Sequence, residues 1–211
     1  MLQRLIERLK LTPAYGIYRF LQQRKTYEDW ARDGIPTPPP PVVKQHIVRS
    51  YAERFSLTTL VETGTYLGEM VLATNDLFDR IYSVEIDETL ARRARKKFSR
   101  PGHVTILQGD SGIVLGKILE KVDVPCLFWL DSHYSGGLTS KGETETPILT
   151  EVRHIFDHSV REHVILIDDA RNFTGEHDYP DMDEFREFVQ SERPGWVFKV
   201  EHDIIRIHER K

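Results

Sequence analysis

Residues 58–87 read TTLVETGTYLGEMVLATNDLFDRIYSVEID, and this stretch decides the fold. Residues 58–63 are rich in β-branched side chains and end at Gly64, so they predict a short strand followed by a sharp turn. Residues 68–78 predict a helix, and residues 80–85 predict a second strand. A strand, a helix and a strand in this order predict a βαβ unit, in which the two strands are parallel.

The same alternation continues through the rest of the chain. Further helices are predicted over 44–55, 88–98, 112–121, 145–157 and 181–191, and further strands over 103–108, 125–130, 163–167, 195–201 and 203–208. Helices between strands predict right-handed crossovers and a sheet covered on both faces. The last two strands are joined so closely that they must form an antiparallel hairpin. The predicted fold class is therefore α/β: a Rossmann-like, mostly parallel seven-stranded sheet with a C-terminal antiparallel hairpin.

The N-terminal residues 1–41 differ from this pattern. Apolar residues recur at helical spacing over 2–9, and a second helical stretch covers 13–30. Residues 36–41 are mostly proline and predict a stiff spacer that is neither helix nor central strand. We expect 1–41 to be an arm and spacer that packs on the domain or on a second copy of the chain, forming a homodimer. A helix on a membrane surface is the weaker alternative. Residues 42–211 form the predicted α/β domain.

Composition narrows the class of protein. The 211 residues suit one domain of generous size, and a formal net charge of -4 gives no basic footprint for nucleic acid. A single cysteine, Cys126, excludes an internal disulfide framework and is typical of a reducing compartment. No apolar run is long enough to span a bilayer, and no signal peptide is recognisable. The expected location is the cytoplasm.

The ends of the first three strands carry residues suited to a nucleoside. Gly64 and Gly68 bracket the turn after the first strand, where the backbone can approach a ligand closely. Glu85 ends the second strand, where an acid can accept hydrogen bonds from both hydroxyls of a ribose. Asp110 and Ser111 follow the third strand and are placed to contact an adenine amino group. Purely structural roles are the alternatives: a glycine turn, and helix N-caps at Asp87 and Ser111.

The ends of the fourth and fifth strands carry three carboxylates. Asp131 follows the fourth strand, and Asp168 and Asp169 follow the fifth. Because neighbouring parallel strands end at the same edge of a sheet, we expect these side chains to lie together. Clustered carboxylates repel one another unless a cation neutralises them, and oxygen ligands suit Mg²⁺. The alternative is that Asp168 and Asp169 only cap a loop.

These residues together resemble the class I S-adenosylmethionine (SAM)-dependent methyltransferases, and more narrowly the macrocin O-methyltransferase-like, metal-dependent group. The resemblance covers roughly 45–210 and implies that the turn after the first strand holds the methionine part of SAM. It implies Glu85 at the ribose, Asp110 and Ser111 at the adenine, and a metal site in which Asp131 also borders the cofactor. The residues implied for the first turn are Glu62, Gly64, Thr65, Tyr66 and Gly68, in a departure from the commoner Gly-x-Gly pattern.

The activity that this resemblance implies is methyl transfer to a hydroxyl of a sugar or a natural-product-like small molecule. A bound Mg²⁺ would orient the hydroxyl and lower its pKa, and a base would remove the proton. His133 is the first candidate for that base and Asp131 the second, with His177 as another possibility. The rival hypotheses are an NAD-dependent oxidoreductase, a metal-dependent sugar transferase, and a non-catalytic module that binds SAM.

Overall fold

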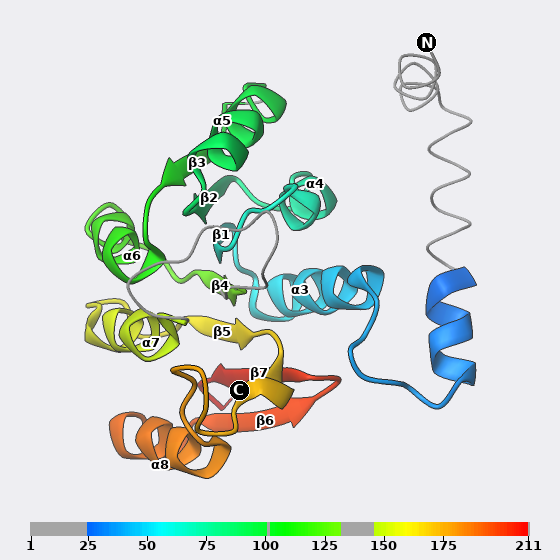
Figure 1. Ribbon diagram of the computed structural model, residues 1–211. Coiled ribbons are helices and arrows are strands. Elements are labelled where there is room, and N and C mark those ends of the chain that lie inside the picture. Colours follow the sequence, from blue (N-terminus) through cyan, green and yellow to red (C-terminus); the bar gives the residue numbers. More distant parts are fainter. Residues whose placement is uncertain (1–24, 101, 132–145, 211) are drawn as a thin grey trace.

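The computed structural model describes residues 25–100, 102–131 and 146–210, and its centre is a seven-stranded sheet (Figure 1). The strand order is β3-β2-β1-β4-β5-β7-β6. The strands are β1 (Thr59–Thr63), β2 (Arg80–Glu85), β3 (Val104–Gln108), β4 (Leu127–Leu130), β5 (Val164–Ile167), β6 (Val197–Glu201) and β7 (Ile204–His208). The bounds of all seven strands lie within two residues of the predicted ones, so the predicted fold class is confirmed.

The direction of the strands follows the prediction as well. The strands β1 to β5 pair in parallel, whereas β7 pairs antiparallel with both β5 and β6. The second strand of the hairpin, β7, therefore lies between β5 and β6, and β6 forms the edge of the sheet. The strand order reverses between β1 and β4, and ligands of open α/β sheets bind at the carboxyl ends of the strands on either side of such a switch point.

In the described part of the chain, six helices cover the two faces of the sheet. One face carries α3 (Pro41–Phe55), α4 (Glu69–Thr74) and α5 (Glu88–Lys97), and the other carries α6 (Ser111–Leu119), α7 (Ile148–Asp157) and α8 (Met182–Glu192). Each face has its own cluster of buried hydrophobic residues: the first lies beneath α3, α4 and α5, and the second beneath α6, α7 and α8. Successive residues of a strand point to opposite faces, so Leu60 packs into the first cluster and Val61 into the second. A short 3₁₀ helix, η1 (Ala170–Asn172), follows β5 and was not predicted.

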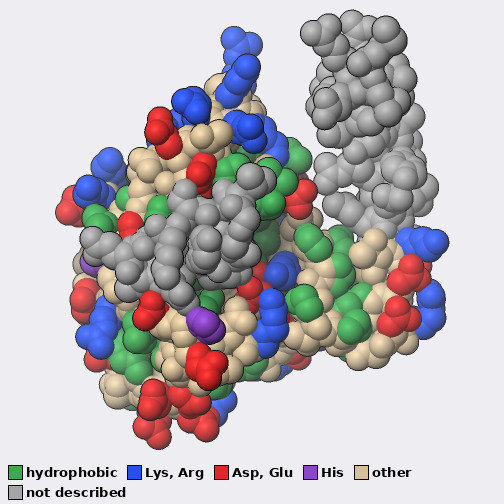
Figure 2. Space-filling view, viewed as in Figure 1, with side chains coloured by type: hydrophobic (Ala, Val, Ile, Leu, Met, Phe, Trp, Pro, Cys, Tyr) green, Lys and Arg blue, Asp and Glu red, His purple; other side chains and the backbone are tan. Residues whose placement is uncertain are grey.

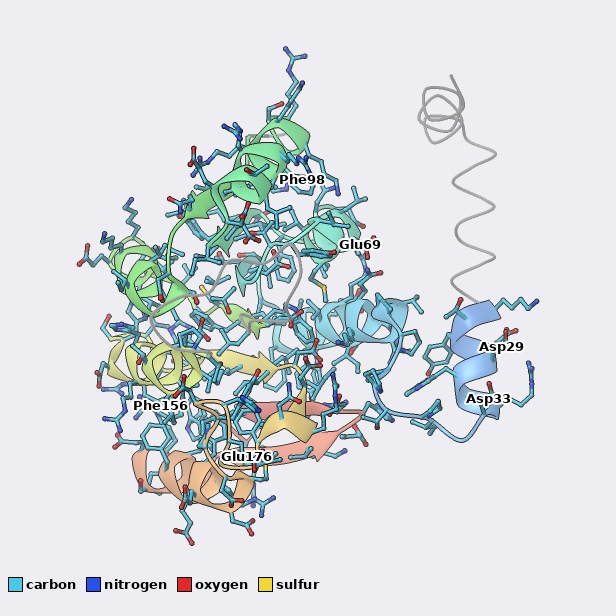
Figure 3. The ribbon with its side chains drawn as sticks, viewed as in Figure 1. Asp29, Asp33, Glu69, Phe98, Phe156 and Glu176 are labelled. Atoms are coloured by element: carbon cyan, nitrogen blue, oxygen red, sulfur yellow. The ribbon has the colours of Figure 1, made fainter. Side chains whose placement is uncertain are left out.

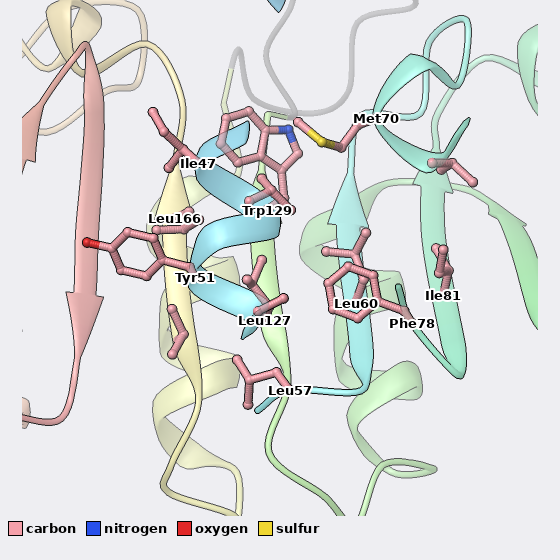
Figure 4. Packing of buried hydrophobic residues seen from close by; sticks show 14 of the residues in the cluster. Ile47, Tyr51, Leu57, Leu60, Met70, Phe78, Ile81, Leu127, Trp129 and Leu166 are labelled. Atoms are coloured by element: carbon pink, nitrogen blue, oxygen red, sulfur yellow. The ribbon is translucent and has the colours of Figure 1, made fainter. Parts of the chain in front are cut away.

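The first of these clusters fixes the position of α3 (Figure 4). Ile47 and Tyr51 of this helix pack over Leu127, Trp129 and the neighbouring strands, and all of these side chains are buried. Each buried aliphatic or aromatic side chain stabilises the fold by about 1.5–3 kcal/mol relative to an exposed one. The helix α3 is thereby held against the sheet.

The proline-rich spacer differs from its prediction at one end. Pro41 begins α3, which extends the predicted helix by three residues, because a proline at the first helical position loses no hydrogen bond. Residues 25–32 are helical; Trp30 packs on His202 at a ring distance of 5.2 Å and donates from Nε1 to the carbonyl of Pro36. Residues 1–24 of the predicted arm lie outside the described residues. Within the described part, no helix is long and apolar enough to cross a membrane.

Charge is unevenly spread over the domain (Figure 2). Lys and Arg side chains gather over α5 at the top of the view, and Asp and Glu side chains over α8 at the bottom. The exposed basic residues of α5 are Arg92, Arg93, Arg95, Lys96 and Lys97. The net charge of -4 is a sum over the whole chain and does not reveal this local basic surface. The absence of a nucleic-acid partner stays a prediction.

Candidate active site at the carboxyl ends of the strands

The register of the sheet brings four of the predicted residues to one edge. Val84, Thr63, Leu130 and Ile167 form one row across β2, β1, β4 and β5, and the residues that follow them are Glu85, Gly64, Asp131 and Asp168. The backbone bonds continue one step beyond the sheet: Asp131 N–H donates to Thr63 O and Asp168 N–H to Leu130 O, each at 3.0 Å. This alignment spans the switch point between β1 and β4.

The loop after β1 is held against Glu85. Gly64 and Gly68 both have positive φ, 89° and 68°, so the turn uses backbone conformations that favour glycine. The Tyr66 N–H donates to Glu85 Oε2 at 2.6 Å, and the Asp87 N–H donates to Oε1 at 2.9 Å. A carboxylate can accept about four hydrogen bonds, so Glu85 keeps acceptor capacity for a ligand. The Asp87 side chain caps α5 by accepting from Leu90 N–H, as the structural alternative predicted.

Gly68 has a second constraint, which is packing. A Cβ atom added to Gly68 would lie 2.6 Å from Cε2 of Phe98. Figure 3 shows Phe98 at the end of α5 beside α4, which begins at Glu69. Glycine is therefore required here both by the backbone conformation and by the close approach of α4 to α5.

Glu62 and Thr63 lie buried directly beneath this loop. Glu62 accepts a hydrogen bond from Ser83, whose hydroxyl lies 2.5 Å from that of Thr65. Burial raises the pKa of Glu62 to about 8, against the effect of the Ser83 hydrogen bond, and the nearby Asp131 and Glu85 raise it further. The buried Thr63 hydroxyl has no hydrogen-bond partner among the described residues. An unsatisfied buried hydroxyl is costly and is consistent with a polar ligand at this position.

Asp110 and Ser111 lie at the next strand end. Asp110 is the N-cap of α6, and its side chain accepts from Gly112 N–H at 2.8 Å. Ser111, for which an N-cap role was the structural alternative, is instead the first residue of the helix and is buried. The Gly109 N–H donates to the Glu85 carbonyl at 2.9 Å, which ties this corner to the end of β2. Contacts of Asp110 and Ser111 with an adenine stay a prediction.

The three predicted carboxylates do come together. Oxygens of Asp131, Asp168 and Asp169 lie within 4.8 Å of one another. Asp168 and Asp169 are buried, and Asp131 is half-buried. Asp169 has a positive φ of 56°, so the backbone enters the left-handed region in the turn directly after β5. The donor set of oxygens alone suits a hard divalent cation.

Among the described residues, two basic side chains that no sequence pattern had indicated face this cluster. Lys44 of α3 forms an ion pair with Asp168 Oδ2, and its Nζ lies 3.7 Å from Asp169 Oδ1. Arg171 Nη1 donates to Asp169 Oδ1 at 2.9 Å and also pairs with Asp203. Burial lowers the pKa of Lys44, but the carboxylates of Asp168, Asp131 and Asp169 together outweigh burial, so the pKa is raised. Lys44 is therefore a charged ammonium within the acidic cluster.

Asp168 shows the electrostatic cost of the cluster. Burial and the adjacent Asp131 carboxylate raise the pKa of Asp168 to about 7, although Lys44 opposes the shift. Tyr179 also lies nearby; burial, with the carboxylates of Asp169 and Asp131, raises its pKa to about 12. Its phenol hydrogen-bonds to Asn172 and Thr146 and remains protonated at neutral pH.

Of the three candidate bases, Asp131 and His177 lie among the described residues and His133 does not. His133 lies outside the described residues, so its role stays a prediction. Asp131 directly follows β4 at the edge of the cluster. His177 lies exposed in the segment between η1 and α8, with a positive φ of 55°.

Comparison with known proteins gives a fold and no closer family. No protein-family profile and no curated protein match the chain. The O-methyltransferase TomG from Streptomyces achromogenes, involved in tomaymycin synthesis and solved with SAM, is 13% identical with a TM-score of 0.59, covering 89% of each chain. An O-methyltransferase from Bacillus cereus is 14% identical with a TM-score of 0.58, covering 89% of this chain and 90% of its own. Podospora anserina methyltransferase PaMTH1 is 18% identical with a TM-score of 0.57, covering 90% and 88%. The chain therefore has the Rossmann-like fold of these methyltransferases.

Proposed function

We propose that this protein is a SAM-dependent methyltransferase that methylates a hydroxyl of a small molecule with help from a divalent cation. One observation carries the proposal. The turn at Gly64, the acid Glu85 and the carboxylates of Asp131, Asp168 and Asp169 meet at one edge of the sheet, across the switch point. A nucleoside cofactor and a cation could therefore be held side by side.

The cofactor would lie along the ends of β1 to β3. Glu62, Gly64, Thr65, Tyr66 and Gly68 would form the wall around its methionine part. The Thr63 hydroxyl, which has no hydrogen-bond partner in the described part of the chain, would supply a polar contact there. Glu85 would accept from the ribose hydroxyls through its remaining lone pairs. Asp110 and Ser111 would border the adenine, and Asp131 would border the sulfonium end. A carboxylate near the sulfonium favours SAM, which carries a positive charge on sulfur, over its product S-adenosylhomocysteine, which does not.

The acceptor would lie over β4 and β5. When bound, SAM would supply an activated methyl group, and Mg²⁺ would supply a positive charge that lowers the pKa of the acceptor hydroxyl. Asp131, Asp168 and Asp169 would hold the cation, as in the metal-dependent, macrocin O-methyltransferase-like group that the sequence resembles. Asp131 or His133 would take the proton. A sugar or natural-product hydroxyl is the proposed acceptor; the part that TomG has in tomaymycin synthesis supports this class.

Calorimetric titration of the purified protein with SAM, S-adenosylhomocysteine and NAD tests the cofactor. We expect both SAM and its product to bind and NAD not to bind. Binding of NAD with no binding of SAM would overturn the proposal in favour of an oxidoreductase, because both cofactor classes use an acid at the end of β2.

A turnover assay tests catalysis and the cation. Labelled SAM is incubated with a panel of hydroxylated sugars and phenols, with Mg²⁺ or with a chelator. We expect transfer that Mg²⁺ restores after chelation. Binding of SAM without transfer to any acceptor would favour a non-catalytic module, and chelator-resistant transfer would remove the cation from the proposal.

Three further predictions complete the proposed function. Residues 42–211 would form the methyltransferase domain and residues 1–41 the arm, through which two copies would form a homodimer. The buried thiol of Cys126 and the absence of a predicted disulfide favour the cytoplasm. Nucleic acid and membrane are not proposed as partners. Light scattering on the full chain and on a chain lacking residues 1–24 tests the homodimer.

A further inference from the structure

We infer that the ammonium of Lys44 and the divalent cation are alternative occupants of the cluster formed by Asp131, Asp168 and Asp169, so that Lys44 must leave before the cation binds. This inference rests on the cation site of the proposed function and adds a residue that controls it. Lys44 is then a positioning residue that sets how tightly the site holds a metal.

Lys44 lies where a cation would bind. It is the fourth residue of α3, its side chain is 19% exposed, and its ammonium pairs with an Asp168 carboxylate that is 1% exposed. The same ammonium lies 3.7 Å from Asp169 Oδ1. A Mg²⁺ bound to these oxygens at about 2.0–2.1 Å would lie within a few ångströms of Nζ. Two cations this close repel one another strongly in a partly buried site.

Of the two basic side chains that face the cluster in the described part of the chain, Lys44 is the one that can move. Arg171 is fixed twice to Asp203, through its backbone N–H at 2.9 Å and through its guanidinium. Among the described residues, the ammonium of Lys44 forms ion pairs only with Asp168 and Asp169, and it lies at the end of a flexible four-carbon stem. The α3 backbone is held by buried Val43 and Ile47, so the ammonium would leave by rotation of the side chain.

The exchange has a physical consequence for the empty site. With Lys44 in place, the buried carboxylates are partly neutralised and the edge of the sheet is stable without a metal. Replacing Lys44 by an uncharged residue removes this competitor and leaves Asp168 without its ammonium. Metal affinity should then rise, and metal-free stability should fall.

Binding of Mn²⁺, followed by electron paramagnetic resonance on the full chain without SAM or acceptor, tests the inference. We expect Lys44→Met and Lys44→Gln to bind Mn²⁺ at least about tenfold more tightly than the original chain, a change of about 1.4 kcal/mol. Lys121→Met is the matched control: it removes the same charge from an exposed residue beyond the end of α6, and it should leave the affinity unchanged. Asp168→Asn should weaken binding in every background.

Thermal unfolding gives the second measurement. Without metal, Lys44→Met should unfold at a lower temperature than Lys121→Met, and Mn²⁺ should raise its unfolding temperature by more. Unchanged or weaker Mn²⁺ affinity in both folded Lys44 variants would overturn the inference, as would a failure of both to bind Mn²⁺. Calorimetry with SAM on the same preparations decides the methyltransferase proposal separately, because the Mn²⁺ titration needs no cofactor.

Discussion

Replacing Glu85 by alanine is the sharpest test of where the cofactor lies. In the structure the Glu85 carboxylate already has one role, since it accepts the N–H groups of Tyr66 and Asp87. In the proposed complex it has a second, which is to accept the hydroxyls of the ribose. Glu85→Ala removes both, so stability and SAM affinity should fall together.

The two effects have different sizes. Hydrogen bonds to a charged group contribute about 1.5–3 kcal/mol each, and water that enters the space left by the removed carboxylate would replace part of this. We therefore expect the free energy of unfolding to fall by about 2–4 kcal/mol, which lowers the unfolding temperature by roughly 5–15 °C in a chain of this size. Loss of the ribose contact should weaken SAM binding by about 1.5–3 kcal/mol, or roughly 10–150-fold in Kd.

Asp87→Ala provides the matched control, because Asp87 lies two residues further on and has a purely structural contact in this structure. It caps α5 through Leu90 N–H, and loss of such a cap costs about 1 kcal/mol. Calorimetry below the unfolding temperature of both variants gives their SAM affinities. Asp87→Ala should bind SAM as the original chain does. If Glu85→Ala also binds SAM with an unaltered Kd, the ribose does not lie at the end of β2 and the proposed orientation of the cofactor is wrong.

Three other outcomes follow from the site. Gly68→Ala should destabilise the chain by about 1–3 kcal/mol in denaturant unfolding, because its Cβ would lie 2.6 Å from Phe98 in a backbone with positive φ; an unchanged midpoint would show that α4 and α5 can move apart freely. The raised pKa of Glu62, about 8 against 4.5, means that its contribution to stability is present below about pH 4.5 and is lost as the pH rises toward 8. Glu62→Gln should therefore reduce the fall in unfolding free energy between pH 5 and pH 8, and equal slopes for the two chains would contradict the assignment. Asp168→Asn should weaken both Mg²⁺ binding and the rate of methyl transfer while SAM affinity stays near its original value; an unchanged rate that also resists a chelator would exclude a catalytic cation.

Most of the fold could be predicted because it follows from local pattern and one general rule. The period of apolar residues and the glycine after residue 63 located the strands, and parallel strands joined by helices must end at one edge. The same rule was enough to bring Asp131 to Asp168 and Asp169, because each directly follows a strand. The exact start of α3 was missed because a proline at the first helical position looks like a spacer when it follows other prolines.

The sequence by itself determined which strands end in a turn, in an acid or in a pair of acids. What the tertiary structure alone decided is which side chains face these ends from elsewhere. Lys44 and Asp168 are 124 residues apart, and they meet because the buried face of α3 fixes its position over the sheet. Arg171 meets Asp203 because the hairpin inserts β7 beside β5. Such contacts depend on the packing of whole elements rather than on periodicity along the chain, so no local pattern of residues could encode them.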